Sequence, residues 1–482
     1  MKLYNTLTHE KEDFTPMDGE NARIYSCGPT VYGYAHIGNM RTYIFNDILR
    51  KSLKYNGYKI KQAINITDVG HLVSDADDGE DKMLKTAKNE DRTPWEIAEF
   101  YTEAFVKDTE KLNIEKPELM PKATGHIKEM IDFVEKLIEK GYWYETSDGI
   151  YFDVTKIPSY GKLSNIDLDA QIAGARVEVN EEKGHPADFA LWKKAPKEHI
   201  MQWESPWGMG YPGWHIECSV MGLKYLGETF DIHTGGVDHI PIHHENEIAQ
   251  SEAYLGHPAV KVWMHGEFLL VNNGKMSKSL GTTFTLSDLE EKGYSPLIFR
   301  YFCLNAHYRN KLNFTWDGIA AAKTAYQRLI DGVAKHKYAA ADADDLSSHA
   351  EGNTADNNTI SKAIDEFKAQ FDDAVNDDLN IPKALGIVWN AVKHNMKSRK
   401  IFDFLVSADA ILSLDLANAE ETKDEDIAED DIPENIKDLV AKRQEARKAK
   451  DFKTADEVRD RLKELGYTIL DTKDGVRVLK DK

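Results

Sequence analysis

The sequence predicts an α/β fold, in which a parallel sheet is interrupted by an inserted domain and followed by a helical bundle and a small C-terminal α+β domain. Three observations predict it. First, a strand, a tight turn and a helix follow one another over residues 22–58. Second, strand-like segments return after residue 213. Third, beyond residue 287 apolar residues recur mostly at the spacing of a helix.

The first strand, turn and helix contain a candidate phosphate site. Residues 22–26 alternate apolar and polar side chains, and apolar residues recur at helical spacing over 41–58. Between them, Gly38 and Asn39 fall near a helix N-terminus, where unpaired backbone N–H groups attract phosphate, and His36 can add a donor. An ordinary capped helix start is the alternative interpretation.

The second predicted strand, 59–66, ends at Asn65-Ile-Thr-Asp68. Ligands of open parallel sheets gather at the carboxyl ends of the strands, so we expect Thr67 and Asp68 to face the same crevice as Cys27. A turn that is merely rich in Thr and Asp would look the same.

An inserted domain is predicted from about residue 116 to 203, where a helix is followed by short strands at 149–154 and 175–179. The sheet resumes near Gly213, with strands at 230–233 and 260–271 and a Gly-rich turn at 234–238. The segment Gly274-Lys-Met-Ser-Lys-Ser-Leu-Gly281 then describes a short mobile loop with two lysines, or simply a solvated basic loop.

The remaining chain is predicted to be helical until its end. The C-terminal part of the chain is predicted to be a helical hairpin followed by a short strand pair around Asp474-Gly475. Helices are expected at 296–304, 318–336, 358–373, 381–394, 408–416, 436–450 and 454–465.

Composition limits the class of protein. The chain has 482 residues, no apolar run near the roughly 20 residues that span a bilayer, and no recognisable signal peptide, so a cytoplasmic protein with no membrane partner is expected. Its three cysteines cannot form a disulfide framework, and Cys303 is expected to be a buried small residue. The formal net charge of -21 argues against a nucleic-acid partner, but the acidity is partly local, because 419–434 is acidic and 437–450 is basic.

Four side chains could bind a metal: Cys27, Cys218, His243 and Glu247. His243 and Glu247 are spaced i, i+4, which places both on one face of a helix. Two sulfurs, an imidazole and a carboxylate suit Zn²⁺. His244 is the main rival of His243, although it would point about a quarter turn away; His239 is a weaker one, since Pro241 interrupts a helix.

The His36-Ile-Gly-Asn39 turn and the Lys275-Met-Ser-Lys278 loop together resemble the paired signatures of class I aminoacyl-tRNA synthetases, and with Cys27 they resemble the cysteinyl-tRNA synthetase family. The resemblance extends over nearly the whole chain. It includes the segments 65–68, 188–193, 213–219, 243–251 and 441–448.

This resemblance implies a Rossmann-like parallel-sheet catalytic domain and an activity. The activity would be ATP-dependent activation of L-cysteine and its transfer to the 3′ end of tRNA(Cys), with one zinc ion per chain, Mg²⁺ accompanying ATP, and a monomer as the expected state. The implied domains are the catalytic domain in two halves at 1–115 and 206–270, the connective insertion at 116–205, the lysine-loop junction at 271–317, the tRNA-binding helical bundle at 318–418, an acidic linker at 419–435 and an anticodon-binding-like domain at 436–482.

Site residues follow from the same resemblance. We expect His36, Asn39, Lys275 and Lys278 to be catalytic, with Thr30, Gly38 and Gly235 also at ATP. We expect Gly28, Thr67, Trp214, His233 and Asp238 to bind cysteine, although the turn at Gly235 could equally contact the ribose. Cys27, Cys218, His243 and Glu247 would be the zinc ligands.

The zinc would explain how cysteine is separated from serine. A pocket that relies on shape rarely separates close isosteres by more than roughly 10²-fold, whereas a thiolate is a far better zinc ligand than an alkoxide. Two alternatives stay open: a ligase of the same family that joins cysteine to an amino sugar, and a catalytically silent protein that binds zinc and RNA.

Overall fold

The computed structural model describes residues 1–70, 82–165, 182–196, 199–276, 281–339, 353–421, 432–449, 451–472 and 475–480. The chain forms two compact units, Met1–Ala419 and Glu420–Lys482. The first contains the sheet, the insertion and the helical bundle, and the second is a small domain with its own core. None of the helices in these ranges combines the length and apolar character needed to cross a membrane.

A four-stranded parallel sheet organises the first unit. Its strand order is β10-β9-β3-β4, so the chain moves outward in one direction from β3 and in the other from β9. The carboxyl ends of β3 and β9 therefore flank a topological switch point, where open α/β sheets bind ligands. The strands are β3 (Asn21–Ser26), β4 (Lys59–Ile64), β9 (Phe230–Gly236) and β10 (Val260–Gly266).

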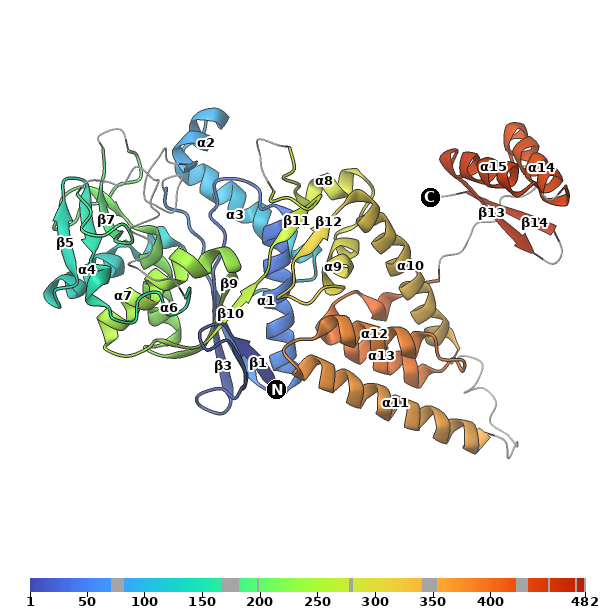
Figure 1. Cartoon of the computed structure of the whole chain (residues 1–482), viewed down its shortest axis with the longest axis horizontal. Coiled ribbons are helices and arrows are strands. Elements are labelled where there is room, and N and C mark those ends of the chain that lie inside the picture. The colour runs from blue at the N-terminus through green and yellow to red at the C-terminus, as the bar shows by residue number, and fades with distance from the viewer. Residues whose placement is uncertain are drawn as a thin grey trace. The chain divides into compact units, whose positions relative to one another are not determined.

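Helices cover both faces of this sheet, as Figure 1 shows for α1 on one side and α6 and α7 on the other. Alternate residues of β3 enter different cores: Ile24 belongs to the core beside α1, and Tyr25 to the core beside α6 and α7. The predicted α/β class is thus confirmed. The covering helices are α1 (Ile37–Tyr55), α6 (Trp214–Leu226) and α7 (Glu245–Leu255).

The insertion forms a second, antiparallel sheet in the order β5-β6-β7-β8. β8 extends this sheet although it lies beyond residue 205, the expected end of the insertion. The predicted strand at 175–179 lies outside the described residues. The elements between the two halves are α2 (Lys82–Glu90), α3 (Pro94–Lys111), η1 (Ala123–His126), α4 (Ile127–Glu139), β5 (Trp143–Thr146), β6 (Gly149–Phe152), η2 (Val154–Lys156), β7 (Phe189–Lys194) and β8 (Gly210–Pro212).

The predicted single strand at 260–271 is wrong, because the chain breaks between β10 and β11 (Leu269–Val271). The buried Arg41 side chain donates hydrogen bonds to the carbonyls of Glu267 and Phe268, at 2.8 and 2.6 Å, and so holds the break in place. β11 then pairs in parallel with β12 (Leu312–Phe314).

The rest of the first unit is helical. The helix expected at 408–416 begins nine residues earlier, since Ser398 caps α13. The helices are α8 (Leu286–Glu291), α9 (Pro296–Leu304), α10 (Trp316–Tyr338), α11 (Asn353–Asn376), α12 (Ile381–Val392), α13 (Arg399–Leu412) and η5 (Leu416–Asn418), and an antiparallel pair, β1 (Lys2–Asn5) and β2 (Glu10–Asp13), begins the chain.

The second unit is a helical hairpin with an antiparallel strand pair. Ile436, Val458, Leu462 and Val478 form its small apolar core. Its elements are α14 (Glu434–Lys448), α15 (Phe452–Glu464), β13 (Tyr467–Thr472) and β14 (Gly475–Lys480).

Candidate active site

A cleft of about 1320 Å³, including its open mouth, lies at the carboxyl ends of the parallel strands. It is lined by the segment that follows β3, the end of β4, the first turns of α1 and α6, and the turn after β9. Ten of the predicted site residues line it: Cys27, Gly28, Thr30, His36, Asn39, Thr67, Trp214, Cys218, Asp238 and His243.

The four predicted metal ligands converge on one wall of the cleft. One donor atom from each of Cys27, Cys218, His243 and Glu247 lies within 4.8 Å of the other three, and all four residues are buried. His243 Nε2 is 3.5 Å from Cys218 Sγ and 3.1 Å from Glu247 Oε1. Cys27 Sγ is 4.0 Å from the same Glu247 oxygen.

Local structure explains how distant residues meet here. Cys27 directly follows β3 and Cys218 lies in α6. His243 lies in a π-helical turn, η4 (Ile240–His244), which runs directly into α7 and places His243 one turn from Glu247. His243 Nδ1 is 2.9 Å from His215 Nδ1, a contact that turns Nε2 toward the sulfurs.

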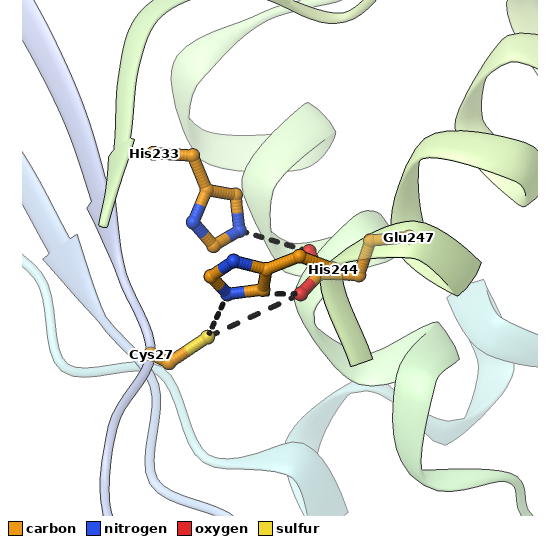
Figure 2. A group of neighbouring side chains, drawn as sticks. All are labelled: Cys27, His233, His244 and Glu247. Carbon is orange, nitrogen blue, oxygen red and sulfur yellow. Dashed lines mark hydrogen bonds and ion pairs between the residues drawn. The ribbon is translucent and has the colours of Figure 1, made fainter. Parts of the chain in front are cut away.

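A second group of potential ligands overlaps the first. Cys27, His233, His244 and Glu247 also bring their donor atoms within 4.8 Å of one another. The Cys27 sulfur lies 3.2 Å from His244 Nε2, and the Glu247 carboxylate lies 2.9 Å from His233 Nε2. Figure 2 shows these four side chains pointing toward one another. On its other side, His244 Nδ1 lies 2.7 Å from His265 Nε2.

The two groups differ in their access to the cleft. Cys218 and His243 line the cleft, whereas His233 and His244 are not among the described residues that line it. An ion held by the first group would therefore face a bound substrate, and an ion held by the second would lie behind the cleft wall. His233, which we predicted to bind cysteine, lies with its Nε2 2.9 Å from Glu247 Oε2.

Burial and mutual contacts shift the pKa values of the four candidate ligands. Burial raises the pKa of the Cys27 thiol, and a hydrogen bond that the Cys218 thiol donates to Cys27, together with burial, raises the pKa of Cys218 well above its usual value. Burial opposes the charge on His243, but Cys218 and Glu247 raise its pKa to about 10. Burial likewise opposes the charge on Glu247, yet His233 and His243 lower its pKa to about 2. A metal ion that takes both sulfurs as thiolates would therefore displace protons.

At the predicted phosphate turn, His36 and Asn39 form a reciprocal cap at the start of α1. Asn39 N donates to His36 Nδ1 and His36 N donates to Asn39 Oδ1, both at 3.1 Å. A Cβ at Gly38 would lie 2.2 Å from Met276 Cε, at the end of a flexible side chain that can move aside. The turn thus contacts the beginning of the lysine loop.

Thr67 is positioned by two polar residues that the sequence analysis did not single out, Asn65 and Glu217. Thr67 Oγ1 donates to Glu217 Oε2 at 2.8 Å and accepts from Asn65 Nδ2 at 3.0 Å. Asn65 Oδ1 in turn accepts from Gly28 N at 2.8 Å. Both residues stand inside segments that carry the resemblance, which was the available signal.

Asp68 does not face the crevice, contrary to expectation. Its carboxylate accepts from Thr124 N at 2.9 Å and Thr124 Oγ1 at 2.6 Å, and so turns away toward η1. Asp68 is absent from the described residues that line the cleft.

The remaining predicted residues occupy different places. The Trp214 ring lies 4.6 Å from the His243 ring. Gly236, not Gly235, is in the cleft lining, because Gly235 lies against the rings of His244 and His239. The Lys275 ammonium lies 5.0 Å from the Phe268 ring and is outside the described lining, and Lys278 lies outside the described residues.

Comparison with known proteins places the chain among relatives of known activity. A family model described as tRNA synthetases class I (C) catalytic domain matches residues 13–324, and one described as cysteinyl-tRNA ligase anticodon binding domain matches residues 429–478. The cysteine–tRNA ligase of Treponema denticola is 44% identical over 484 residues, with 98% of each chain covered. That of Caldicellulosiruptor saccharolyticus is 43% identical over 487 residues, with 100% of each chain covered.

A solved structure shares the fold at low sequence identity. Methionyl-tRNA synthetase of Mycobacterium tuberculosis in complex with methionyl-adenylate superposes with a TM-score of 0.54 at 14% identity. The match covers 82% of this chain and 90% of that one.

Proposed function

The chain belongs to the class I tRNA synthetases, among the cysteine–tRNA ligases, and we propose that it activates L-cysteine with ATP and transfers it to the 3′ end of tRNA(Cys). The convergence of Cys27, Cys218, His243 and Glu247 on a wall of the cleft supports this proposal most strongly. It places two sulfurs where a substrate side chain can reach them.

These four residues fit zinc. Tetrahedral zinc with bonds of about 2.0–2.3 Å separates its ligand atoms by roughly 3.3–3.8 Å. The separations of 3.1, 3.5 and 4.0 Å between the donor atoms are close to that range. When bound, zinc would accept the sulfur of cysteine as a further ligand, which serine could not replace.

For activation, we propose that the cysteine carboxylate attacks the α-phosphate of ATP. A carboxyl–phosphate bond forms, the bond to pyrophosphate breaks, and Mg²⁺ accompanies the nucleotide. Thr30, His36, Gly38 and Asn39 would hold the nucleotide from the cleft side, while Lys275 and Lys278 would neutralise the charge that develops on the phosphates.

Lys278→Ala tests the role of the lysine loop. We expect cysteine-dependent pyrophosphate exchange to fall by about 10²-fold or more, as when one electrostatic partner of a transition state is removed. Bound zinc should stay at the wild-type level, because the metal ligands are untouched. Near-normal exchange would refute the role of Lys278.

For the main-chain groups of cysteine, we propose contacts from Gly28, Thr67, Trp214, His233 and Asp238. Asp238 lines the cleft and can pair with the ammonium, and Thr67 is held in place by Asn65 and Glu217. Gly235 is proposed to lie at the ATP ribose.

RNA binding is proposed for the bundle at 318–418 and the domain at 436–482, and the match of residues 429–478 to an anticodon binding domain supports the second of these. We propose a cytoplasmic monomer.

One assay separates the candidate activities. Labelled cysteine and ATP are supplied with tRNA(Cys), with an amino-sugar acceptor, or with neither. We expect transfer to tRNA only. Transfer to the amino sugar would favour the ligase that uses this acceptor. Transfer to neither acceptor, in a protein that binds zinc, would favour the catalytically silent protein.

A further inference from the structure

Aromatic side chains gather at the rim of the cleft in a way that the first reaction step does not require. Tyr34, Tyr101 and Phe105 all line the cleft, and Phe100 lies beside them on α3. α3 lies next to the shorter α2 (Figure 1). We define the aromatic rim as Tyr34, Phe100 and Tyr101.

The three rings of the aromatic rim meet edge to face. Tyr34 lies 5.1 Å from Tyr101 and 6.1 Å from Phe100, and Phe100 lies 5.1 Å from Tyr101, with interplanar angles of 89°, 73° and 83°. Such contacts hold rings in fixed orientations. The rim is therefore an ordered surface.

Two of these rings remain partly open to solvent. Tyr34 is 54% exposed and Phe100 is 38% exposed, whereas Tyr101 is buried and donates its hydroxyl to Glu90. Exposed, contiguous aromatic surface next to a cleft marks an interaction site.

The charged groups around the rim are engaged within the protein. The Arg92 guanidinium lies 4.7 Å from the Phe100 ring centre. Glu96 accepts hydrogen bonds from Thr93, and Glu99 pairs with Lys122 at 2.6 Å. This surface offers ring faces and an arginine rather than a row of free cations, so it suits a flat base better than a phosphate.

We propose that Tyr34 and Phe100 form a stacking platform for an unpaired base at the 3′ end of the RNA acceptor. This inference rests on the proposed function, because transfer requires the single-stranded 3′ end to pass the rim and enter the cleft. Single-stranded RNA ends are recognised chiefly by stacking on aromatic and arginine side chains. Tyr34 stands two residues before His36, so a base on the platform would lie next to the phosphate turn.

The platform is tested by RNA binding with two probes: tRNA(Cys), and the same RNA shortened by its unpaired 3′ nucleotides. Stacking contributes about 5- to 100-fold in affinity per base. We expect Phe100→Leu and Tyr34→Leu each to weaken binding of the full-length RNA within that range, with little effect on the shortened RNA. Tyr34→Phe keeps the ring and should restore wild-type binding.

Trp95→Leu is the matched control. Trp95 is 48% exposed on the same helix, but five residues separate it from Phe100, which places it about 140° around the helix axis. Its loss should leave binding of both RNAs unchanged. Because Tyr34 and Phe100 lie in different elements, one variant can be tested if the other unfolds.

Each other outcome overturns the platform. If the variants bind both RNAs equally more weakly, the contact lies elsewhere on the acceptor. If RNA binding is unchanged but the KM for ATP in pyrophosphate exchange rises, the rings contact adenine. If neither quantity changes, the rings have no role in binding. Failure of the wild-type chain to charge tRNA at all would instead contradict the proposed function.

Discussion

At the scale of single residues, the choice between two overlapping ligand sets is central. Both use Cys27 and Glu247, but only the set with Cys218 and His243 opens to the cleft. His233 contacts the second oxygen of the Glu247 carboxylate, and His244 lies 3.9 Å from the oxygen that His243 contacts, so both can support the site without binding the ion.

Cys218→Ser and His233→Asn should therefore differ in metal content. We expect Cys218→Ser to lose about 100-fold or more in zinc affinity, because a hydroxyl is a poor zinc ligand. His233→Asn should keep one zinc per chain, since an amide at this position can still donate to Glu247. Metal analysis after dialysis against a chelator measures both, and the reverse pattern would favour the second set.

Residue identities could be predicted only where a side chain acts directly. Helical spacing favoured His243 over His244 with Glu247, and the structure brings His243 to the cleft. Asn65 and Glu217 act through hydrogen bonds to Thr67, and although both lie in segments that carry the family resemblance, the linear sequence does not reveal that they contact Thr67. Asp68 was expected in the crevice because strand-end position does not determine which way a side chain turns.

At the scale of elements, the turn after β3 depends on the absence of a side chain at Gly28. A Cβ at this position would lie 1.5 Å from the Asn65 carbonyl oxygen at the end of β4. Backbone on both sides leaves nothing that can move aside, so the two strand ends would have to separate.

Gly28→Ala should consequently destabilise the protein and disturb Cys27. We expect the free energy of unfolding in urea to fall by at least about 2 kcal/mol, as in overpacked cores, with reduced zinc binding. Gly33→Ala is the matched control, because a Cβ at Gly33 meets nothing within 4 Å. Similar stability of the two variants would show that the strand ends can separate at little cost.

Element boundaries could be predicted to within a residue where apolar periodicity is strong, as in β3 and α9, whereas α1 begins four residues before the expected range 41–58 and ends three residues before its end. The segment 260–271 was misjudged because apolar residues are dense on both sides of Gly266 and Glu267. The break there depends on Arg41, more than two hundred positions away in the chain, and such a partner cannot be identified from local pattern.

At the scale of the whole molecule, the chain is divided between two compact units, and the proposed chemistry lies entirely in Met1–Ala419. The parallel sheet and the later helices followed from the sequence because each half of the sheet carries its own strand and helix pattern, but the order of the strands in the sheet was not predicted. The place of β8 in the antiparallel sheet did not, because three residues carry too little periodicity.

Shortening the chain to end at Ala419 should separate the two reaction steps. We expect the shortened protein to fold and to support pyrophosphate exchange within about two-fold of the full chain, since the units have separate cores. Charging of tRNA(Cys) should fall at least about ten-fold, the effect of losing about 1.4 kcal/mol of RNA binding. Full charging activity would argue against RNA recognition by the second unit.

The central claim is that the ion held by Cys27, Cys218, His243 and Glu247 coordinates the sulfur of the substrate and thereby selects cysteine. The most direct measurement is the visible absorption of the cobalt-substituted protein during titration with free amino acids. The account predicts that cysteine alters the ligand-field and sulfur-to-cobalt bands while serine does not. A spectrum that cysteine leaves unchanged, in a protein that still makes cysteinyl-adenylate, would contradict it.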